Sequence, residues 1–219
     1  MELSYASLKA MHREVRDRFP ESLALRTHRA LSWLNRAEIE EEDADAKYIF
    51  LWIALNAAYA HEITDRANFS ERRMFLRFLD RLIRADRDCL LHDTVWEHFP
   101  GPIRLLLANQ YVCQEFWDFH TGRIGAAEWE LRFQSSKNAA TRALGQRDTK
   151  RVLAIVFDRL YVLRNQLVHG GATWNSKVNR SQLRDGGRIL AVVVPTFIYL
   201  LLKSPEHEWG TPSYPVIRV

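Results

Sequence analysis

Three polar side chains stand at the end of an otherwise apolar segment of this sequence. The segment from Asp148 to Trp174 reads DTKRVLAIVFDRLYVLRNQLVHGGATW, and it holds Arg164, Asn165 and His169 just before a pair of glycines. A histidine can hold or pass a proton near neutral pH, and an arginine is always a cation. Together they suit phosphoryl chemistry on RNA, in which a 2′-OH attacks the adjacent phosphodiester. That reaction requires proton transfer and a cation for the phosphate, but no metal.

Helical spacing predicts how these side chains lie. Asn165 and His169 are four residues apart and share a helix face, whereas Arg164 lies about 100° round from Asn165. Asp158 and Tyr161 fall roughly on the Asn165–His169 side. The helix macrodipole favours an imidazolium at the C-terminal end. A plainer interpretation is a C-capping histidine and an arginine that binds the last carbonyls or a carboxylate.

The apolar part of the segment predicts the central helix of the fold. Apolar residues occur almost all the way round it, so the helix must be buried among others. Gly170 and Gly171 are expected to end it, because glycine favours the position after a helix C-terminus.

Further helices are predicted on both sides of this segment, over residues 22–41, 47–63, 71–91, 103–120, 126–144 and 180–202. Asp43 or Asp45, Ser70 and Asn179 are the expected N-caps. No segment shows convincing β-alternation. The sequence therefore predicts an all-α helical bundle with a central buried helix that carries Arg164, Asn165 and His169 at its C-terminal end.

Positive charge is concentrated in the last third of the chain. Residues 151–219 contain nine Lys or Arg against four Asp or Glu, whereas the whole chain has a net charge of +4. Lys177, Arg180, Arg184 and Arg188 are spaced three, four and four apart, so on a helix they would share one face. This stripe suits a phosphate backbone, and it equally suits an ordinary solvated face.

Two residues of the 47–63 helix are secondary candidates. Asn56 is the polar interior residue of that helix, and Tyr59 follows one turn later. The favoured interpretation is a core amide that a neighbouring helix satisfies. The alternative is that both residues line the site formed by Arg164 and His169.

Composition indicates a single globular domain over residues 1–219. The chain has 219 residues, 47% of them hydrophobic, and no low-complexity linker divides it. Residues 1–21 form an N-terminal segment, and the proline-containing tail 204–219 is expected to be extended and either to pack back or to bind a partner. The sequence shows no apolar signal region, and its longest apolar run, residues 189–202, contains Pro195. We therefore expect a cytoplasmic protein that does not enter a membrane.

Cysteine and histidine spacing predicts no metal site and no cofactor. The histidines His92, His98 and His120 are scattered, and no zinc-type Cys/His pair or phosphate-binding glycine loop occurs. Cys89 and Cys113 stand in apolar helical context, which predicts two buried, reduced thiols.

The octapeptide RNQLVHGG at the end of an apolar helix resembles the motif of the HEPN superfamily, the higher-eukaryote and prokaryote nucleotide-binding α-helical domains. That motif is an arginine, a polar residue that is often asparagine, a short spacer and a histidine. The surrounding RLYVLRNQLVHGGATW and the earlier FLWIALNAAY are similar to stand-alone, bacterial, Apea-like HEPN proteins. The resemblance is strong over residues 148–203 and loose over residues 22–65.

The resemblance implies a homodimer in which the motif helices face each other, so that each Arg/His pair contributes to one composite cleft on the two-fold axis. Many members are metal-independent endoribonucleases that leave 2′,3′-cyclic phosphate ends, often in toxin–antitoxin or other defence systems. By this resemblance His169 would transfer the proton, Arg164 would contact the scissile phosphate, and Asn165 would orient the two or bond the backbone. An antitoxin or another protein would then be a further partner.

The alternative is a non-catalytic HEPN module, because the family also contains members that only bind or only assemble. In that case the same cleft would bind RNA, a nucleotide or a protein partner without cutting anything.

Overall fold

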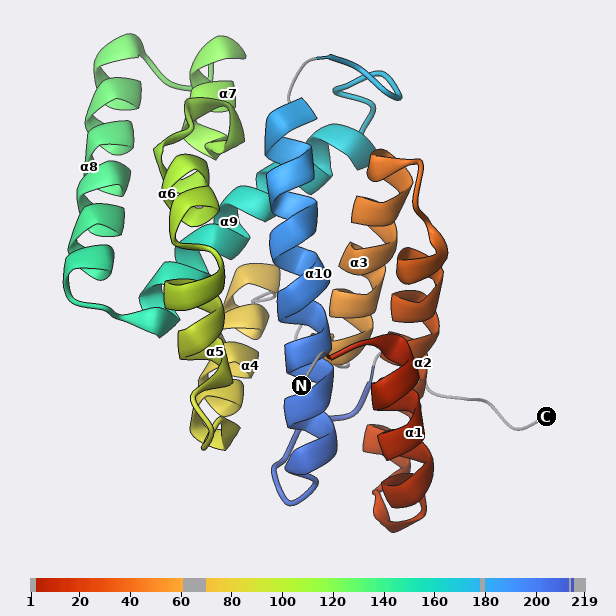
Figure 1. Cartoon of the computed structure of the whole chain (residues 1–219). Helices are drawn as coiled ribbons and strands as arrows, with labels where there is room; N and C mark the ends of the chain where they lie inside the picture. Colours follow the sequence, from red (N-terminus) through yellow and green to blue (C-terminus); the bar gives the residue numbers. More distant parts are fainter. Residues whose placement is uncertain (1–2, 61–69, 178–179, 213, 215–219) are drawn as a thin grey trace. The chain divides into compact units, whose positions relative to one another are not determined.

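The computed structural model describes residues 3–60, 70–177, 180–212 and 214, and these residues are all-α (Figure 1). Ten α-helices and no strand occur in them. The helices are α1 (Tyr5–Val15), α2 (Glu21–Ile39), α3 (Ala44–Tyr59), α4 (Glu71–Ala85), α5 (Leu90–Asp93), α6 (Pro100–Ala108), α7 (Gln114–His120), α8 (Ala126–Gly145), α9 (Thr149–Val168) and α10 (Arg180–Lys203). The shorter turns are η1 (Arg16–Arg18), η2 (Thr94–His98) and η3 (Gln110–Val112). The all-α class predicted from the sequence is confirmed for these residues.

The chain forms two compact units, which are described separately. Unit 1 comprises residues 1–90 and 190–219, and unit 2 comprises residues 91–189. Helix α10 contributes its first part, up to residue 189, to unit 2 and the remainder to unit 1.

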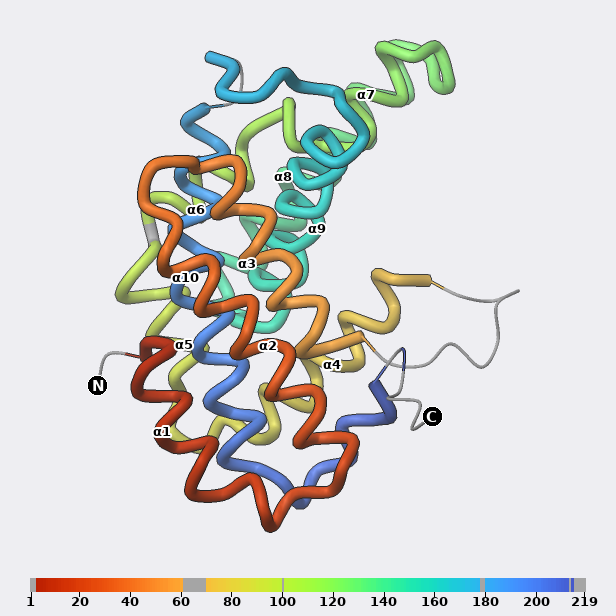
Figure 2. The backbone as a smooth tube through the Cα atoms, turned by 90° about the vertical axis from the view of Figure 1, so that its right-hand side faces the viewer, coloured from red at the N-terminus to blue at the C-terminus, as the bar shows by residue number. Residues whose placement is uncertain are grey.

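Unit 1 is built on the pair α2 and α3, which run side by side in both views (Figures 1 and 2). Helix α1 packs on α2, and α4 packs on α3. Aromatic side chains join α4 to the last part of α10 and to the C-terminal tail, because Phe78 lies 5.8 Å from Phe197 and 5.9 Å from Trp209 between ring centroids. Trp209 is buried, so residues 204–212 pack back on unit 1. The rest of the tail, Tyr214 excepted, lies outside the described residues.

A buried arginine holds the end of α3 and the tail together. Arg26 of α2 donates hydrogen bonds to the carbonyl oxygens of Ala58 (2.8 Å), Ala60 (2.9 Å) and Gly210 (3.0 Å). Its side chain is fully buried, and burial lowers the pKa of Arg26 to about 10. Burying a cation is costly, and these three main-chain oxygens partly offset that cost while they hold the end of α3 and the tail at Arg26.

Unit 2 consists of the helices that surround α9. Helix α8 contacts α9 and leads into it, α6 packs on α9, and α7 packs on α8. Burial is uneven, because α7 buries none of its residues, and α8 buries only Ala140 and Ala143, near its C-terminal end. The α7–α8 pair therefore extends beyond the core of this unit.

The predicted helix bounds agree with the structure where hydrophobic periodicity is unbroken. Helices α2, α8 and α10 begin and end within two residues of the predicted ranges. The side chains of Asp43, Ser70 and Asp148 cap α3, α4 and α9. The predicted cap Asn179 lies outside the described residues, as does the predicted end of the 47–63 helix beyond its C-cap Ala60.

Two predicted helices are wrong in their extent. The single helix expected over 103–120 is broken into α6, η3 and α7, because Asn109 and Cys113 adopt extended backbone conformations. The Asn109 side chain accepts a hydrogen bond from the Tyr111 amide at 2.8 Å, a local bond that competes with the helix. Helix α4 ends at Ala85, and Cys89 lies in the following turn with a φ of +57°. The expectation that Cys89 is buried is also wrong, because the thiol is exposed, whereas Cys113 is buried.

Among the described helices, α10 is long and apolar enough to cross a membrane by length and composition alone. However, 67% of its most apolar window is buried inside the protein. This burial is compatible with a soluble protein. The helix runs through Pro195 without interruption.

Candidate functional site

The last turn of α9 carries the polar residues singled out in the sequence. Most of the helix is buried before that turn, whereas Arg164 and Asn165 are half-buried and His169, the C-cap residue, is exposed. The chain leaves the helix at Gly170, which has a φ of +69°, a backbone conformation that glycine adopts without strain. Glycine therefore ends the helix where it was predicted to.

Arg164 folds across the end of the helix rather than away from it. Its Nη1 donates a hydrogen bond to Asn165 Oδ1 at 2.9 Å, and its guanidinium lies 5.6 Å from the centre of the Tyr161 ring. By helical spacing, Tyr161 and Asn165 lie on the same side of the helix as His169. These contacts draw the positive charge of Arg164 round toward the His169 side.

Asp158 stands two turns before Asn165, on the same side of the helix by spacing, and is half-buried. With Tyr161 it completes the group expected on this face. The structure thus brings Tyr161, Arg164 and Asn165 into contact, and it leaves the exposed His169 at the end of the same helix.

Gln166 connects this turn of α9 to two other segments of unit 2. Its Nε2 donates a hydrogen bond to the Tyr111 carbonyl in η3 at 2.8 Å. Its own main-chain oxygen accepts a hydrogen bond from the Ala172 amide at 3.2 Å. A Cβ atom at Gly171 would lie 3.2 Å from that same oxygen, so glycine allows the loop to fold back closely on α9. The side chain of Gln166 therefore holds η3, and its backbone holds the loop that follows α9.

A second contact holds η3 against α9, two turns earlier. The buried Arg159 donates to Cys113 Sγ at 2.8 Å and also to the Ser136 hydroxyl of α8, and the Cys113 thiol donates to Glu115 at 2.9 Å. Burial raises the pKa of Cys113 to about 12, and its hydrogen bond to Glu115 adds to the shift. The thiol therefore stays protonated and links the arginine to the carboxylate.

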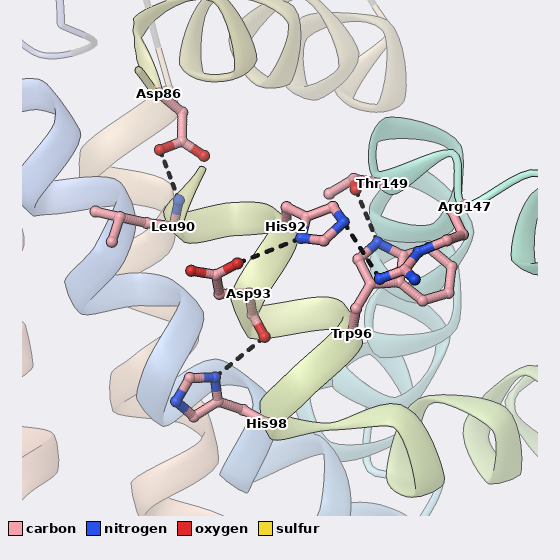
Figure 3. A network of polar contacts seen from close by, with 8 residues as sticks. All are labelled: Asp86, Leu90, His92, Asp93, Trp96, His98, Arg147 and Thr149. Atoms are coloured by element: carbon pink, nitrogen blue, oxygen red, sulfur yellow. Dashed lines mark hydrogen bonds and ion pairs between the residues drawn. The ribbon is translucent and has the colours of Figure 1, made fainter. Parts of the chain in front are cut away.

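The opposite end of α9 is held by an aromatic and polar cluster (Figure 3). Trp96 Nε1 donates to the Thr149 hydroxyl at 2.9 Å, and the Arg147 guanidinium lies 5.4 Å from the Trp96 ring centre. His92 bridges Asp93 (3.3 Å) and Arg147 (3.5 Å) through its two ring nitrogens. These contacts fix the beginning of α9, so the helix is anchored at both ends.

The predicted basic stripe is only partly helical. Helix α10 begins at Arg180, and Lys177 lies in a bend before it, so that Arg180, Arg184 and Arg188 are the helical members of the stripe. Arg180 is half-buried, and its Nε donates to the Ser176 carbonyl at 3.0 Å. Arg184 and Arg188 follow at helical spacing and are exposed, with Arg188 4.0 Å from Asp185.

The secondary candidates Asn56 and Tyr59 belong to unit 1, whereas Arg164 and His169 belong to unit 2. That the two pairs share a site stays a prediction. Tyr59 is buried, and its hydroxyl donates to Glu71 at 2.8 Å. The buried Oδ1 of Asn56 has no hydrogen-bond partner among the described residues, so the partner expected from a neighbouring helix is absent for this atom.

No group of three or more His, Cys, Asp or Glu side chains in the described part of the chain is arranged to hold a metal ion. Comparisons with protein-family models, curated proteins and solved structures found no match to this chain.

Three residues beside the site were not assigned from the sequence. They are Gln166, which holds η3 against α9, and the exposed aromatic residues Tyr111 and Trp174. Tyr111 lies within the range predicted as one continuous helix, so the sequence did not predict the turn η3 that contains it. Trp174 lies in a loop that follows two glycines, and an aromatic residue in such a loop was the signal that could have revealed it.

Proposed function

We propose that the protein is a metal-independent endoribonuclease whose reacting groups are Arg164 and His169. The observation that carries the proposal is the last turn of α9, where a half-buried arginine bonded to Asn165 precedes an exposed histidine at the helix end. An exposed imidazole is accessible for proton transfer from a 2′-OH or to a leaving oxygen. A guanidinium offers donors that match phosphate oxygens as charge builds on them.

The surrounding charge supports a polyanionic substrate. From residue 164 to residue 189 the chain holds five Arg or Lys and one carboxylate, Asp185. Arg184 and Arg188 present their charge to solvent on the first turns of α10, in the same compact unit. Asn165, bonded to Arg164, serves as the positioning residue. The HEPN-like sequence RNQLVHGG supports a dimer in which two such helix ends form one composite cleft, and it supports a role in a toxin–antitoxin or defence system.

The first prediction is loss of RNA cleavage in His169→Ala and in Arg164→Ala. The wild-type protein is expected to cut single-stranded RNA in EDTA and to leave 2′,3′-cyclic phosphate ends. Each variant is expected to lose roughly 10²- to 10⁴-fold in rate, because a proton-transfer group or a phosphate-binding cation is missing. Product ends are identified by mass spectrometry, and folding is checked by circular dichroism.

Matched controls come from unit 1, where His28→Ala and Arg77→Ala replace exposed residues of the same types. Both controls should cut like the wild type. Equal cutting by wild type, His169→Ala and Arg164→Ala would show that the activity is contamination and would refute the site. Salt-sensitive RNA binding without product would instead identify a non-catalytic binding module.

A further inference from the structure

We propose that Tyr111 and Trp174 are base-stacking platforms on either side of Gln166, so that the site takes single-stranded RNA with unstacked bases. This inference rests on the proposed function, because it specifies the form of RNA that reaches Arg164 and His169. The site would then contain two residues that bind bases, in addition to the groups that act on the phosphate.

The first observation is the exposure of the two aromatic side chains. Tyr111 is 45% exposed and Trp174 is 75% exposed, and both belong to the compact unit that contains the site. Val168, in the last turn of α9, is also exposed. Large apolar side chains that stay exposed to water in segments bonded to a polar site suggest that a ligand covers them when it binds.

The second observation is that Gln166 ties both aromatic segments to the turn of α9 that carries the site. Its side chain holds the Tyr111 carbonyl at 2.8 Å, and its main-chain oxygen holds Ala172, two residues before Trp174, at 3.2 Å. Gln166 is also three residues before His169, or about 60° from it round the helix. Tyr111 and Trp174 are therefore attached next to the His169 side of the helix end.

The third observation is that Tyr111 is held in place before any ligand binds. Its ring meets Phe116 edge-to-face with centroids 5.2 Å apart, and its carbonyl also accepts a hydrogen bond from Trp117 Nε1 at 2.9 Å. The contact of Arg159 with Cys113 fixes the same segment two residues later. A rigid ring loses little entropy when a base stacks on it, which favours its use as a binding platform.

Charge indicates which occupant this surface takes. The exposed aromatic side chains lie in the same unit as Arg164 and the exposed cations Lys177, Arg184 and Arg188. Aromatic faces combined with cations bind single strands, because bases stack on the rings while phosphates meet the cations. In a duplex the bases are stacked on each other and their faces are not accessible to the rings.

The test measures binding of a short fluorescein-labelled 2′-O-methyl oligoribonucleotide by anisotropy, using the full chain. The methyl group removes the 2′-OH nucleophile, so binding is observed without cutting. Tyr111→Leu and Trp174→Leu are each expected to weaken binding of the single strand by about 5- to 150-fold, the range for loss of one stacked base. Tyr111→Phe and Trp174→Phe, which keep an aromatic face, should bind nearly as the wild type does.

Salt dependence separates stacking from loss of charge. The leucine variants should keep the wild-type slope of affinity against salt, whereas Arg184→Ala should reduce it. The control Tyr214→Leu alters a tyrosine that is 87% exposed in unit 1 and should bind normally. The wild type should also bind the single strand more tightly than the matching duplex.

The binding and cleavage results distinguish failure of the stacking inference from failure of the proposed function. If wild type cuts and binds RNA but the leucine variants bind equally well, the stacking inference is overturned and the proposed function stands. The same holds if duplex and single strand bind alike, or if the leucine variants lose self-association instead of RNA affinity. If the wild type neither cuts nor binds RNA, the proposed function fails and the inference fails with it.

Discussion

At the scale of single residues, His12 is a buried ionisable group in α1. Its ring is buried in α1, and neither nitrogen has a hydrogen-bond partner among the described residues. Burial lowers the pKa of His12 from 6.5 to about 4, and the nearby positive charges of Lys9, Arg16 and His28 add to the shift. The folded protein therefore holds His12 neutral at pH values where the unfolded chain protonates it.

This shift predicts that unit 1 loses stability in mild acid. Because the folded-state pKa is below the unfolded value of 6.5, the unfolded chain binds the extra proton between pH 6.5 and about pH 4. The contribution of His12 is complete above pH 6.5 and falls with decreasing pH by up to about 1.4 kcal/mol per unit. Urea unfolding at pH 7 and pH 5 measures it, and His12→Leu should show a smaller loss than the wild type. An equal loss in both proteins would contradict the assignment.

At the scale of elements, the end of α9 depends on a glycine that other residues cannot replace without strain. Gly170 has a φ of +69°, and Gly122, in the turn after α7, has a φ of +74°. Gly170→Ala and Gly122→Ala should each lower the free energy of unfolding by about 1 kcal/mol, because a Cβ disfavours this conformation. Only Gly170→Ala should also reduce RNA cleavage, since it alters the backbone next to His169. Denaturant unfolding and the EDTA-resistant cleavage assay measure the two effects.

The two glycine variants distinguish an effect on the free energy of unfolding from an effect on the position of His169. Equal cleavage by Gly170→Ala and Gly122→Ala, at equal loss of stability, would mean that the exit from α9 does not position His169. A larger loss of stability in Gly122→Ala would mean that strain at the α7 turn couples to the core of unit 2.

Sequence patterns predicted the elements well where helix signals were local. The apolar periodicity of α9 and its terminal Gly170 specified the helix and its end, whereas its N-cap Asp148 was identified only in the structure. The break at Asn109 was not predictable in the same way, because no glycine or proline marks it and Asn109 and Gln110 stand between the apolar runs LLLA and YVC. It depends on a bond from the Asn109 side chain to the backbone and on long-range contacts of Gln166 and Arg159 with η3. Tyr111 was missed for that reason.

At the scale of the whole molecule, charge and burial are distributed unevenly. The cations near α9 and the first part of α10 lie in the unit whose α7–α8 pair buries little of its surface. The composite-site proposal adds a second copy of the chain, with two α9 ends contributing to one cleft. In that arrangement one defective subunit alters the cleft that its partner also uses.

Subunit mixing therefore tests the composite site directly. Wild-type protein mixed with a ninefold excess of His169→Ala is predicted to lose about 90% of its cleavage per wild-type subunit, because nearly every wild-type chain then pairs with a defective one. The control is the same mixture with His28→Ala, which alters an exposed histidine of unit 1 and is itself active, so the rate per total chain should equal that of the wild type alone. Light scattering at the same concentrations gives the oligomeric state. A rate that simply tracks the amount of wild-type chain, or a stable monomer at micromolar concentration, would show that each chain carries a complete and independent site.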